Sequence, residues 1–313
     1  MSSGPEPPTG RQHDLRYGGQ RATVVEVGGG LRSYTVDGAP VLDGYEAGER
    51  CTGGRGQVLV PWPNRLAGGR YQFAGHDHQV ALTEPEQDNA IHGLVRWANW
   101  TLLEGADDRV VLGHLLHPQP GYPFCLDLRI SYVLGGEGLT VETKATNVGS
   151  SPLPFGAGAH PYLTLGTPTV DPLVLRAPGA TWMPTDDHQI PTGTEPVDSS
   201  PYDFRSPRPI GTTVLDTGFA DLERGDDGRA RVEVATADGT RRAALWMGPA
   251  YRWLMLFTGD SLRQPHRRRQ GLGVEPMTCP PDAFRTGQGV IVLEPGQTFT
   301  GAWGITPGAG RGT

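Results

Sequence analysis

The sequence contains little cysteine and no long apolar run. Its three cysteines are far apart, odd in number and outside any Cys-x-x-Cys pattern, which is typical of free thiols in a reducing cytoplasm. No apolar stretch approaches the ~20 residues that a membrane-spanning helix needs. Residues 1–14 are polar and rich in proline, unlike a secretory signal. We therefore expect a cytoplasmic protein that does not associate with a membrane.

Positive charge is also in short supply. The chain has 27 Lys and Arg residues against 34 Asp and Glu residues, which gives a formal net charge of -7. Proteins that attract nucleic acid or anionic lipid through their overall charge need the opposite sign. The composition argues against nucleic acid as a partner and favours small molecules or other proteins.

Helical periodicity is absent as well. No window longer than about 12 residues shows a sustained period of 3.6 without Gly or Pro, and no internal repeat indicates a propeller or a solenoid. The chain instead carries 46 Gly and 29 Pro residues, which interrupt helices but suit short strands joined by turns. An all-β fold with few short helices is predicted.

Alternating hydrophobicity locates individual strands. Residues 126–134 place apolar side chains on one face and polar side chains on the other, and residues 139–146 repeat this pattern after a Gly-rich turn. The two segments predict a hairpin with solvated outer faces. We expect a disordered leader over residues 1–19, a single domain over 20–306 and a flexible tail over 307–313. The Pro-rich stretch 192–210 predicts a long surface loop, because strand patterning resumes after it.

Polar residues concentrate in a few short segments where an ordinary β-sandwich needs no polarity. These segments are 61–65, 89–97, 158–162 and 274–283. Each combines an ionisable group with aromatic or small residues. This combination suits a sugar, because aromatic faces pack on C–H surfaces while charged and amide groups form hydrogen bonds with hydroxyls.

The same segments resemble the aldose 1-epimerase family of galactose mutarotase-like proteins, over roughly residues 20–306. The matching motifs, in the family's order, are Asn64-Arg65 with Gly69-Arg70-Tyr71 and Phe73-x-Gly75, Asn89-x-x-His92-Gly93-Leu94-Val95-Arg96, His160-Pro161-Tyr162, Leu215-Asp216-x-x-Phe219, and Glu275 with Pro281-Asp282-Ala283. The resemblance implies a large antiparallel β-sandwich, the galactose mutarotase-like supersandwich, with the sugar in an open cleft.

The resemblance also implies an activity and roles for single residues. The family interconverts the α and β anomers of an aldose, with galactose or glucose as the default substrate. Glu275 would be the general base at the C1 hydroxyl, and His160 the general acid at the ring oxygen. The residues implied to bind the substrate are His92, Arg65, Asp216, Asn64, Trp62 and Tyr162.

Elementary chemistry supports these residue types. Ring opening removes a proton at O1 and supplies one at O5, so a carboxylate and an imidazolium on different sides of the sugar match the two steps. Histidine suits the acid role because its ordinary pKa of about 6.5 lets it hold and release a proton near neutrality. Neither step requires a cofactor, and no cofactor or metal is predicted.

Several alternatives stay open on the sequence alone. His76 and His78 could bind a metal, but Gly75 favours a hairpin turn at this place. The run 263–269 is interpreted as a solvated loop, although its arginines could bind the anionic group of a hexose 6-phosphate or another acidic sugar. The chain could also be a carbohydrate-binding module without turnover. A monomer or a homodimer is expected.

Overall fold

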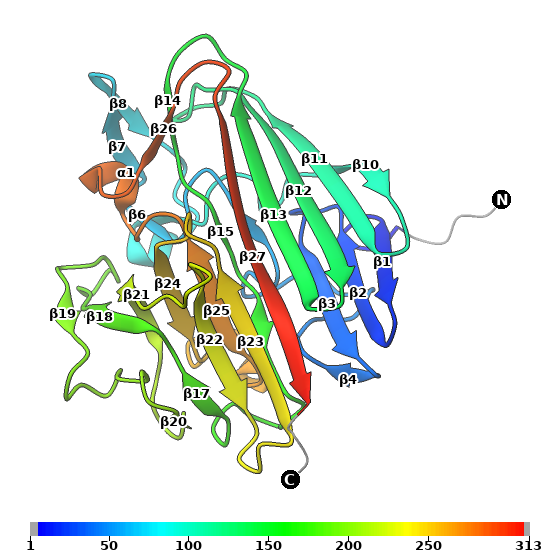
Figure 1. Cartoon of the computed structure of the whole chain (residues 1–313). Helices are drawn as coiled ribbons and strands as arrows, with labels where there is room; N and C mark the ends of the chain where they lie inside the picture. Colours follow the sequence, from blue (N-terminus) through cyan, green and yellow to red (C-terminus); the bar gives the residue numbers. More distant parts are fainter. Residues whose placement is uncertain (1–5, 310–313) are drawn as a thin grey trace.

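The computed structural model describes residues 6–309, and these consist almost wholly of antiparallel β-strands (Figure 1). The helices are short and are α1 (Ala283–Thr286) and the 3₁₀ turns η1 (Pro85–Gln87) and η2 (Pro265–Arg267). No helix in this part of the chain has the length and apolarity needed to cross a bilayer. The predicted all-β class with few short helices is confirmed.

Two large sheets make up most of the domain. The nine-stranded sheet has the order β10 (Thr101–Gly105), β11 (Arg109–Leu116), β12 (Leu126–Gly135), β13 (Gly138–Asn147), β27 (Thr298–Ala309), β23 (Arg241–Met247), β22 (Ala230–Ala235), β17 (Val174–Arg176) and β20 (Arg208–Pro209). The eight-stranded sheet has the order β19 (Glu195–Pro196), β18 (Gly179–Met183), β21 (Asp216–Leu222), β24 (Trp253–Phe257), β25 (Leu272–Met277), β15 (Gly158–Ala159) and β5 (Val58–Leu59), and β16 (Tyr162–Leu163) also pairs with β25. The long strands β12, β13 and β27 lie side by side in Figure 1.

Smaller sheets complete the structure. One contains β1 (Gln12–Tyr17), β2 (Gln20–Val25), β3 (Leu31–Val36) and β4 (Ala39–Pro40). The two-stranded sheets are β6 (Arg65–Ala67) with β9 (Asn89–Ile91), β7 (Arg70–Phe73) with β8 (His76–Gln79), and β14 (Leu153–Phe155) with β26 (Ile291–Leu293).

One hydrophobic cluster joins the two large sheets. In β12 every second residue is buried, as the alternation over 126–134 predicts. Leu128 and Ile130 of this strand belong to the same cluster as Leu256 and Val274 of the eight-stranded sheet. The predicted hairpin of β12 and β13 is confirmed by their continuous antiparallel register. The sheets therefore bury one face each against a common core, as in other β-sandwiches.

The structure corrects both predicted domain boundaries. β1 begins at Gln12 and pairs with β2, and Leu15 is fully buried, so this part of the predicted leader is ordered. β27 continues to Ala309 because it pairs with β23 as far as Arg241, so Pro307 belongs to a strand. Residues 1–5 and 310–313, which fall under the same two predictions, lie outside the described residues.

The segment 192–210 differs in part from the predicted surface loop. It contributes β19 and β20, which are the edge strands of the two large sheets. Val197 and Phe204 are buried in the hydrophobic core. The proline-rich composition gave no indication of these buried residues, because only a few residues of the segment are apolar.

The hairpin predicted around Gly75 is confirmed. β7 pairs with β8 from Arg70 to Phe73, and Gly75 has a φ of 80° in the turn between them. The ring of His78 stacks on Tyr71, with 4.9 Å between the ring centroids. Within residues 6–309, neither His76 nor His78 joins a group of three metal-ligating side chains.

Candidate active site

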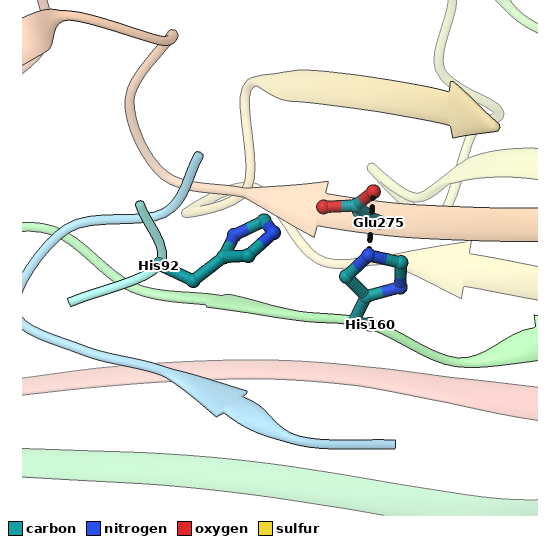
Figure 2. Close-up of side chains that lie close together, drawn as sticks. All are labelled: His92, His160 and Glu275. Atoms are coloured by element: carbon teal, nitrogen blue, oxygen red, sulfur yellow. Dashed lines mark ion pairs between the residues drawn. The ribbon is translucent and has the colours of Figure 1, made fainter. Parts of the chain in front are cut away.

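Glu275 and His160 face each other across paired strands. Glu275 lies in β25, and His160 lies between β15 and β16, which both pair with β25. The register sets Gly158 opposite Met277, and β16 continues the same register, so His160 lies opposite Glu275. His160 Nε2 is 3.2 Å from Glu275 Oε1 (Figure 2). Strand pairing thus joins two side chains that are far apart in the chain.

β25 is buried on both faces, which explains why a carboxyl group lies inside the protein. Leu272 and Val274 belong to the hydrophobic core, and the alternate positions, Gly273 and Glu275, face the other side of the sheet. Glu275 is 2% exposed, and its Oε2 has no hydrogen-bond partner among residues 6–309. Burial of a carboxyl oxygen without a hydrogen-bond partner destabilises the folded protein. Such an atom is therefore typical of a site that binds a ligand.

Burial shifts the proton equilibria of this pair. Desolvation raises the pKa of Glu275 well above its ordinary value, and the charge of Asp216 acts in the same direction. Desolvation lowers the pKa of His160 to about 3, and the charges of Arg55 and Arg96 lower it too. Both shifts favour the arrangement in which Glu275 holds the proton and His160 is neutral over the reverse arrangement.

The imidazole of His160 is held between two neighbours. Tyr162 stacks on it, with 4.9 Å between ring centroids and 11° between the planes. The Tyr162 hydroxyl donates to the carbonyl of Gly53 at 2.7 Å, and the Arg55 guanidinium lies 4.5 Å from the centre of the Tyr162 ring. A β-carbon at Gly54 would lie 2.7 Å from His160 Cδ2. Tyr162 and Gly54 therefore position the general-acid candidate.

His92 completes the cluster shown in Figure 2. Its backbone has a φ of 63°, which non-glycine residues rarely adopt and which is often found at functional sites. Two hydrogen bonds to Asn64 hold it: the His92 N–H donates to the Asn64 carbonyl at 2.9 Å, and the Asn64 N–H donates to His92 Nδ1 at 3.2 Å. Because Nδ1 accepts, the proton of the neutral ring is assigned to Nε2.

The electrostatics of His92 match this assignment. Desolvation lowers its pKa well below the ordinary value, and the charges of Arg96 and Arg65 add to the effect. The rings of His92 and His160 meet edge to face, with 5.3 Å between their centroids. His92 thus offers a neutral N–H donor beside the proton-carrying pair.

The same three side chains could be considered as metal ligands. The nitrogen and oxygen atoms of His92, His160 and Glu275 lie within 4.8 Å of one another, and zinc accepts two imidazoles and a carboxylate. A metal-bound imidazole uses an unprotonated nitrogen and normally donates its other N–H to a neighbour. His92 Nδ1 accepts a hydrogen bond instead, and His160 Nδ1 has no partner in residues 6–309. The arrangement fits acid–base chemistry better than metal coordination.

The cluster lies in a pocket of about 400 Å³, which Asn64, Arg65 and Asp216 also line. Arg65 forms two hydrogen bonds with Glu84, Nε to Oε2 at 2.8 Å and Nη2 to Oε1 at 3.2 Å. Asp216 begins β21 and pairs with Phe257 of β24. Desolvation raises the pKa of the Asp216 carboxyl group. The pocket therefore offers fixed donors and acceptors of the kind that sugar hydroxyls need.

Most of the residues proposed from the sequence meet in this pocket. Those that line it are Asn64, Arg65, His92, His160, Asp216 and Glu275. Trp62 is 2% exposed and packs on Phe284 in the core, so the structure corrects the expectation that it borders the sugar. Tyr162 is buried beneath His160 and does not line the pocket.

The pocket also contains residues to which the sequence analysis assigned no role. Glu84 pairs with Arg65, and Arg96 lies at the pocket wall. No local pattern marks Glu84, because only the fold brings it to Arg65. Arg96 belongs to the same sequence motif as His92, so this motif could have indicated that Arg96 lies near the site.

The fold and the site together define an all-β protein with a buried acid–base pair in a pocket of monosaccharide size. The sequence matches the aldose 1-epimerase family over residues 12–306, and the chain belongs to that family. The fold prediction, a galactose mutarotase-like β-sandwich, is confirmed by these matches.

Individual relatives cover almost the whole chain. The uncharacterised protein YihR of Escherichia coli K12 is 33% identical over 290 residues, which span 92% of this chain and 91% of YihR. The structure resembles that of the GalM/aldose epimerase homologue of C. elegans, with a TM-score of 0.86 and 17% identity over 96% of this chain and 99% of that one. It also resembles galactose 1-epimerase of Lactobacillus acidophilus, with a TM-score of 0.81 and 20% identity over 95% and 94% of the two chains.

Proposed function

We propose that this protein is an aldose 1-epimerase that interconverts the α and β anomers of a pyranose by opening and reclosing the ring. The observation that carries the proposal is the buried pair of His160 and Glu275, 3.2 Å apart, in a pocket of about 400 Å³. Membership of the aldose 1-epimerase family supports the same activity. Galactose and glucose are the first substrates to test.

Ring opening uses two proton transfers at different oxygens. In the proposed complex, the O1 hydroxyl meets Oε2 of Glu275, the carboxyl oxygen without a partner in the described chain, and O5 meets Nε2 of His160. In this complex the proton of the pair moves from Glu275 to His160, because O1–H donates to the Glu275 carboxylate and O5 accepts from the His160 imidazolium. Glu275 takes the O1 proton, the C1–O5 bond breaks as the C1 carbonyl forms, and His160 gives its proton to O5.

Reclosure returns the pair to its starting state. After opening, Glu275 carries the proton and His160 is neutral, which is the distribution that burial favours. Rotation about C1–C2 presents the other face of the aldehyde. O5 attacks C1 and returns its proton to His160, while Glu275 protonates the carbonyl oxygen to give the opposite anomer. No group is consumed in the cycle.

The remaining pocket residues have binding roles in this proposal. His92 donates its Nε2–H to the ring oxygen and disperses charge that develops there. Arg65, held by Glu84, donates to hydroxyls, and Asp216 accepts from hydroxyls farther from C1. Asn64 acts mainly through the two hydrogen bonds that orient His92.

Polarimetry of freshly dissolved α-glucose and α-galactose tests the activity. We expect the protein to speed the approach to the equilibrium rotation, and the Glu275→Gln variant to lose this effect. Saturable sugar binding with no acceleration for any aldose would overturn the proposal and favour a carbohydrate-binding module. A cytoplasmic location, which the three free cysteines support, and a monomeric or homodimeric state stay predictions.

A further inference from the structure

The loop of residues 51–57 contacts His160 through its backbone. The Gly56 N–H donates to the His160 carbonyl at 2.9 Å, and the His160 N–H donates to the Gln57 carbonyl at 3.2 Å. Residues 51–54 of this loop line the pocket, whereas the Arg55 side chain is 2% exposed and does not line it. The loop therefore brings a buried guanidinium close to His160 without exposing it to the sugar.

Arg55 forms a buried ion pair with Asp43. Its Nε and Nη2 both donate to Asp43 Oδ2, at 3.1 and 3.0 Å, and its Nη1 donates to the Thr52 carbonyl at 3.2 Å. The Asp43 N–H donates to the Tyr162 carbonyl at 2.9 Å. Replacement of a buried ion pair by apolar side chains often leaves a protein equally stable or makes it more stable. Stability alone therefore does not account for a charged pair at this place.

A second cation also contacts Asp43. Arg267 Nη2 lies 3.1 Å from Asp43 Oδ1, the oxygen that Arg55 does not use. This pairing helps to fix the arginine-rich run 263–269, to which Arg267 belongs. The Asp43 carboxylate thus keeps a cationic partner if Arg55 is replaced.

Tyr162 connects Arg55 to His160. The Arg55 guanidinium lies over the Tyr162 ring, 4.5 Å from its centroid, and the His160 imidazole stacks on the same ring with 11° between the planes. A guanidinium over an aromatic face is held there by cation–π attraction. Because Asp43 fixes the guanidinium and the tyrosine is buried, these contacts restrict the imidazole to the orientation in which its Nε2 meets Glu275.

The charge of Arg55 also reaches His160. After desolvation, this charge is the strongest influence that lowers the pKa of the imidazole. An imidazolium destabilised by a nearby positive charge gives up its proton more readily, which is what a general acid must do. The titratable and charged groups that face the ring are Arg55, Arg96, His92, Tyr162 and Glu275.

We propose that Arg55 is a positioning residue for His160: held by Asp43, its guanidinium keeps the Tyr162 ring against the imidazole, and its charge favours release of the proton to O5. The inference rests on the proposed epimerase function and extends its machinery to a side chain outside the pocket. Arginine suits this role because its guanidinium is planar, stays charged and forms hydrogen bonds in fixed directions, whereas the ammonium group of lysine is a compact point charge.

Substitutions at Arg55 separate contact from charge. Arg55→Met keeps an unbranched apolar side chain but removes the charge, and Arg55→Lys keeps the charge but removes the planar contact. We expect kcat for anomerisation to fall ~10-fold or more in Arg55→Met at nearly constant KM, and Arg55→Lys to recover part of the loss. A folded Arg55→Met protein with the wild-type kcat would overturn the inference.

Arg267→Gln is the matched control, because it removes the other cation from Asp43 and leaves the contact with Tyr162 unchanged. It is expected to keep the wild-type kcat. An equal fall in kcat for Arg267→Gln and Arg55→Met would assign the effect to the ion pairs of Asp43 and overturn the role of Arg55. If Arg55→Met does not fold, the double substitution Asp43→Asn with Arg55→Met removes the carboxylate as well and takes its place, with the same expected loss.

The titration of His160 gives a readout that a purely structural role would not change. NMR of histidine-labelled protein follows the ring, and the His160→Ala variant identifies its signal. Because its pKa is about 3, the wild-type ring is expected to stay neutral far below the ordinary value of about 6.5. In Arg55→Met the ring should take up its proton at a pH higher by about 1, and in Arg55→Lys close to the wild-type pH.

This measurement needs no turnover, so it separates the inference from the epimerase function. If the wild type turns over no sugar but Arg55→Met shifts the titration of His160, the epimerase proposal fails and the coupling of Arg55 to His160 stands. If the wild type is active and the titration is the same in Arg55→Met, the inference fails and the epimerase function stands.

Discussion

His160 lies between β15 and β16, whose registers with β25 place it across from Glu275, and the two side chains meet at 3.2 Å. Opposite residues on one face of paired strands are held at a fixed separation. The distance between the proposed acid and base is therefore a property of the sheet and does not depend on a mobile loop. Precise placement of this kind is what acid–base catalysis requires.

Removing either member of the pair is expected to abolish most of the activity. Glu275→Gln keeps the shape but cannot accept the O1 proton, and His160→Ala cannot protonate O5, so each should lower kcat by ~10²–10⁴. Polarimetry gives the rates, and circular dichroism with thermal melting checks that each variant folds. A folded variant with the wild-type rate would remove the corresponding residue from the mechanism.

The stability of the protein is expected to depend on pH through Glu275. Its pKa is raised in the folded state, so the folded protein binds more protons than the unfolded chain once the pH exceeds the ordinary pKa of the carboxyl group. The contribution of Glu275 to the free energy of unfolding therefore decreases as the pH rises from the ordinary pKa of its carboxyl group to the raised pKa. Because Glu275→Gln does not titrate, we expect it to be stabilised relative to the wild type, and increasingly so as the pH rises above about 4.5.

Urea denaturation of the two proteins at several pH values measures this difference. The contributions of the other titratable groups cancel from the comparison, because both proteins contain these groups. A difference that stays constant across the pH range would mean that the Glu275 carboxyl group is not desolvated in the folded state.

Gly54 is expected to be required for activity as well as for stability. Gly54→Ala places a β-carbon 2.7 Å from His160 Cδ2 at a φ of +73°, so the imidazole must move, and displacements near 1 Å can cost ~10²-fold in rate. Gly75→Ala is the matched control, because Gly75 has a φ of +80° but no atom within 4 Å of the added carbon. Both variants should lose about 1 kcal/mol of stability from the left-handed backbone.

Rates and melting temperatures of the two glycine variants separate these effects. Only Gly54→Ala should lose activity. Equal rates for Gly54→Ala and Gly75→Ala would show that contact with Gly54 does not position His160.

Tyr162 is expected to act through the orientation of His160. Tyr162→Phe removes the hydroxyl bond to Gly53 but keeps the ring stacked on the imidazole, so it should cost about 1 kcal/mol of stability with little change in kcat. Tyr162→Leu removes the stack and should lower kcat by ~10-fold or more at nearly constant KM. A larger rise in KM than fall in kcat for Tyr162→Leu would indicate direct contact with the sugar instead.

The amino-acid sequence by itself determined the fold class and the main members of the site. Alternating residues over 126–134 define one buried face of β12 without reference to any partner strand, because side-chain direction in a strand has a period of two. Short motifs around His92, His160 and Glu275 indicated the family, since each motif is local in the chain.

Only the tertiary structure decided what each side chain contacts. Trp62 is buried on Phe284 while Trp97 is exposed in the pocket, although both belong to short segments that combine ionisable and aromatic residues. Arg267 and Arg269 pair with Asp43 and Asp171, which are carboxylates from distant segments. Burial and charge compensation are set by strands that meet across the fold, and a local pattern holds no information about residues that arrive from elsewhere in the chain.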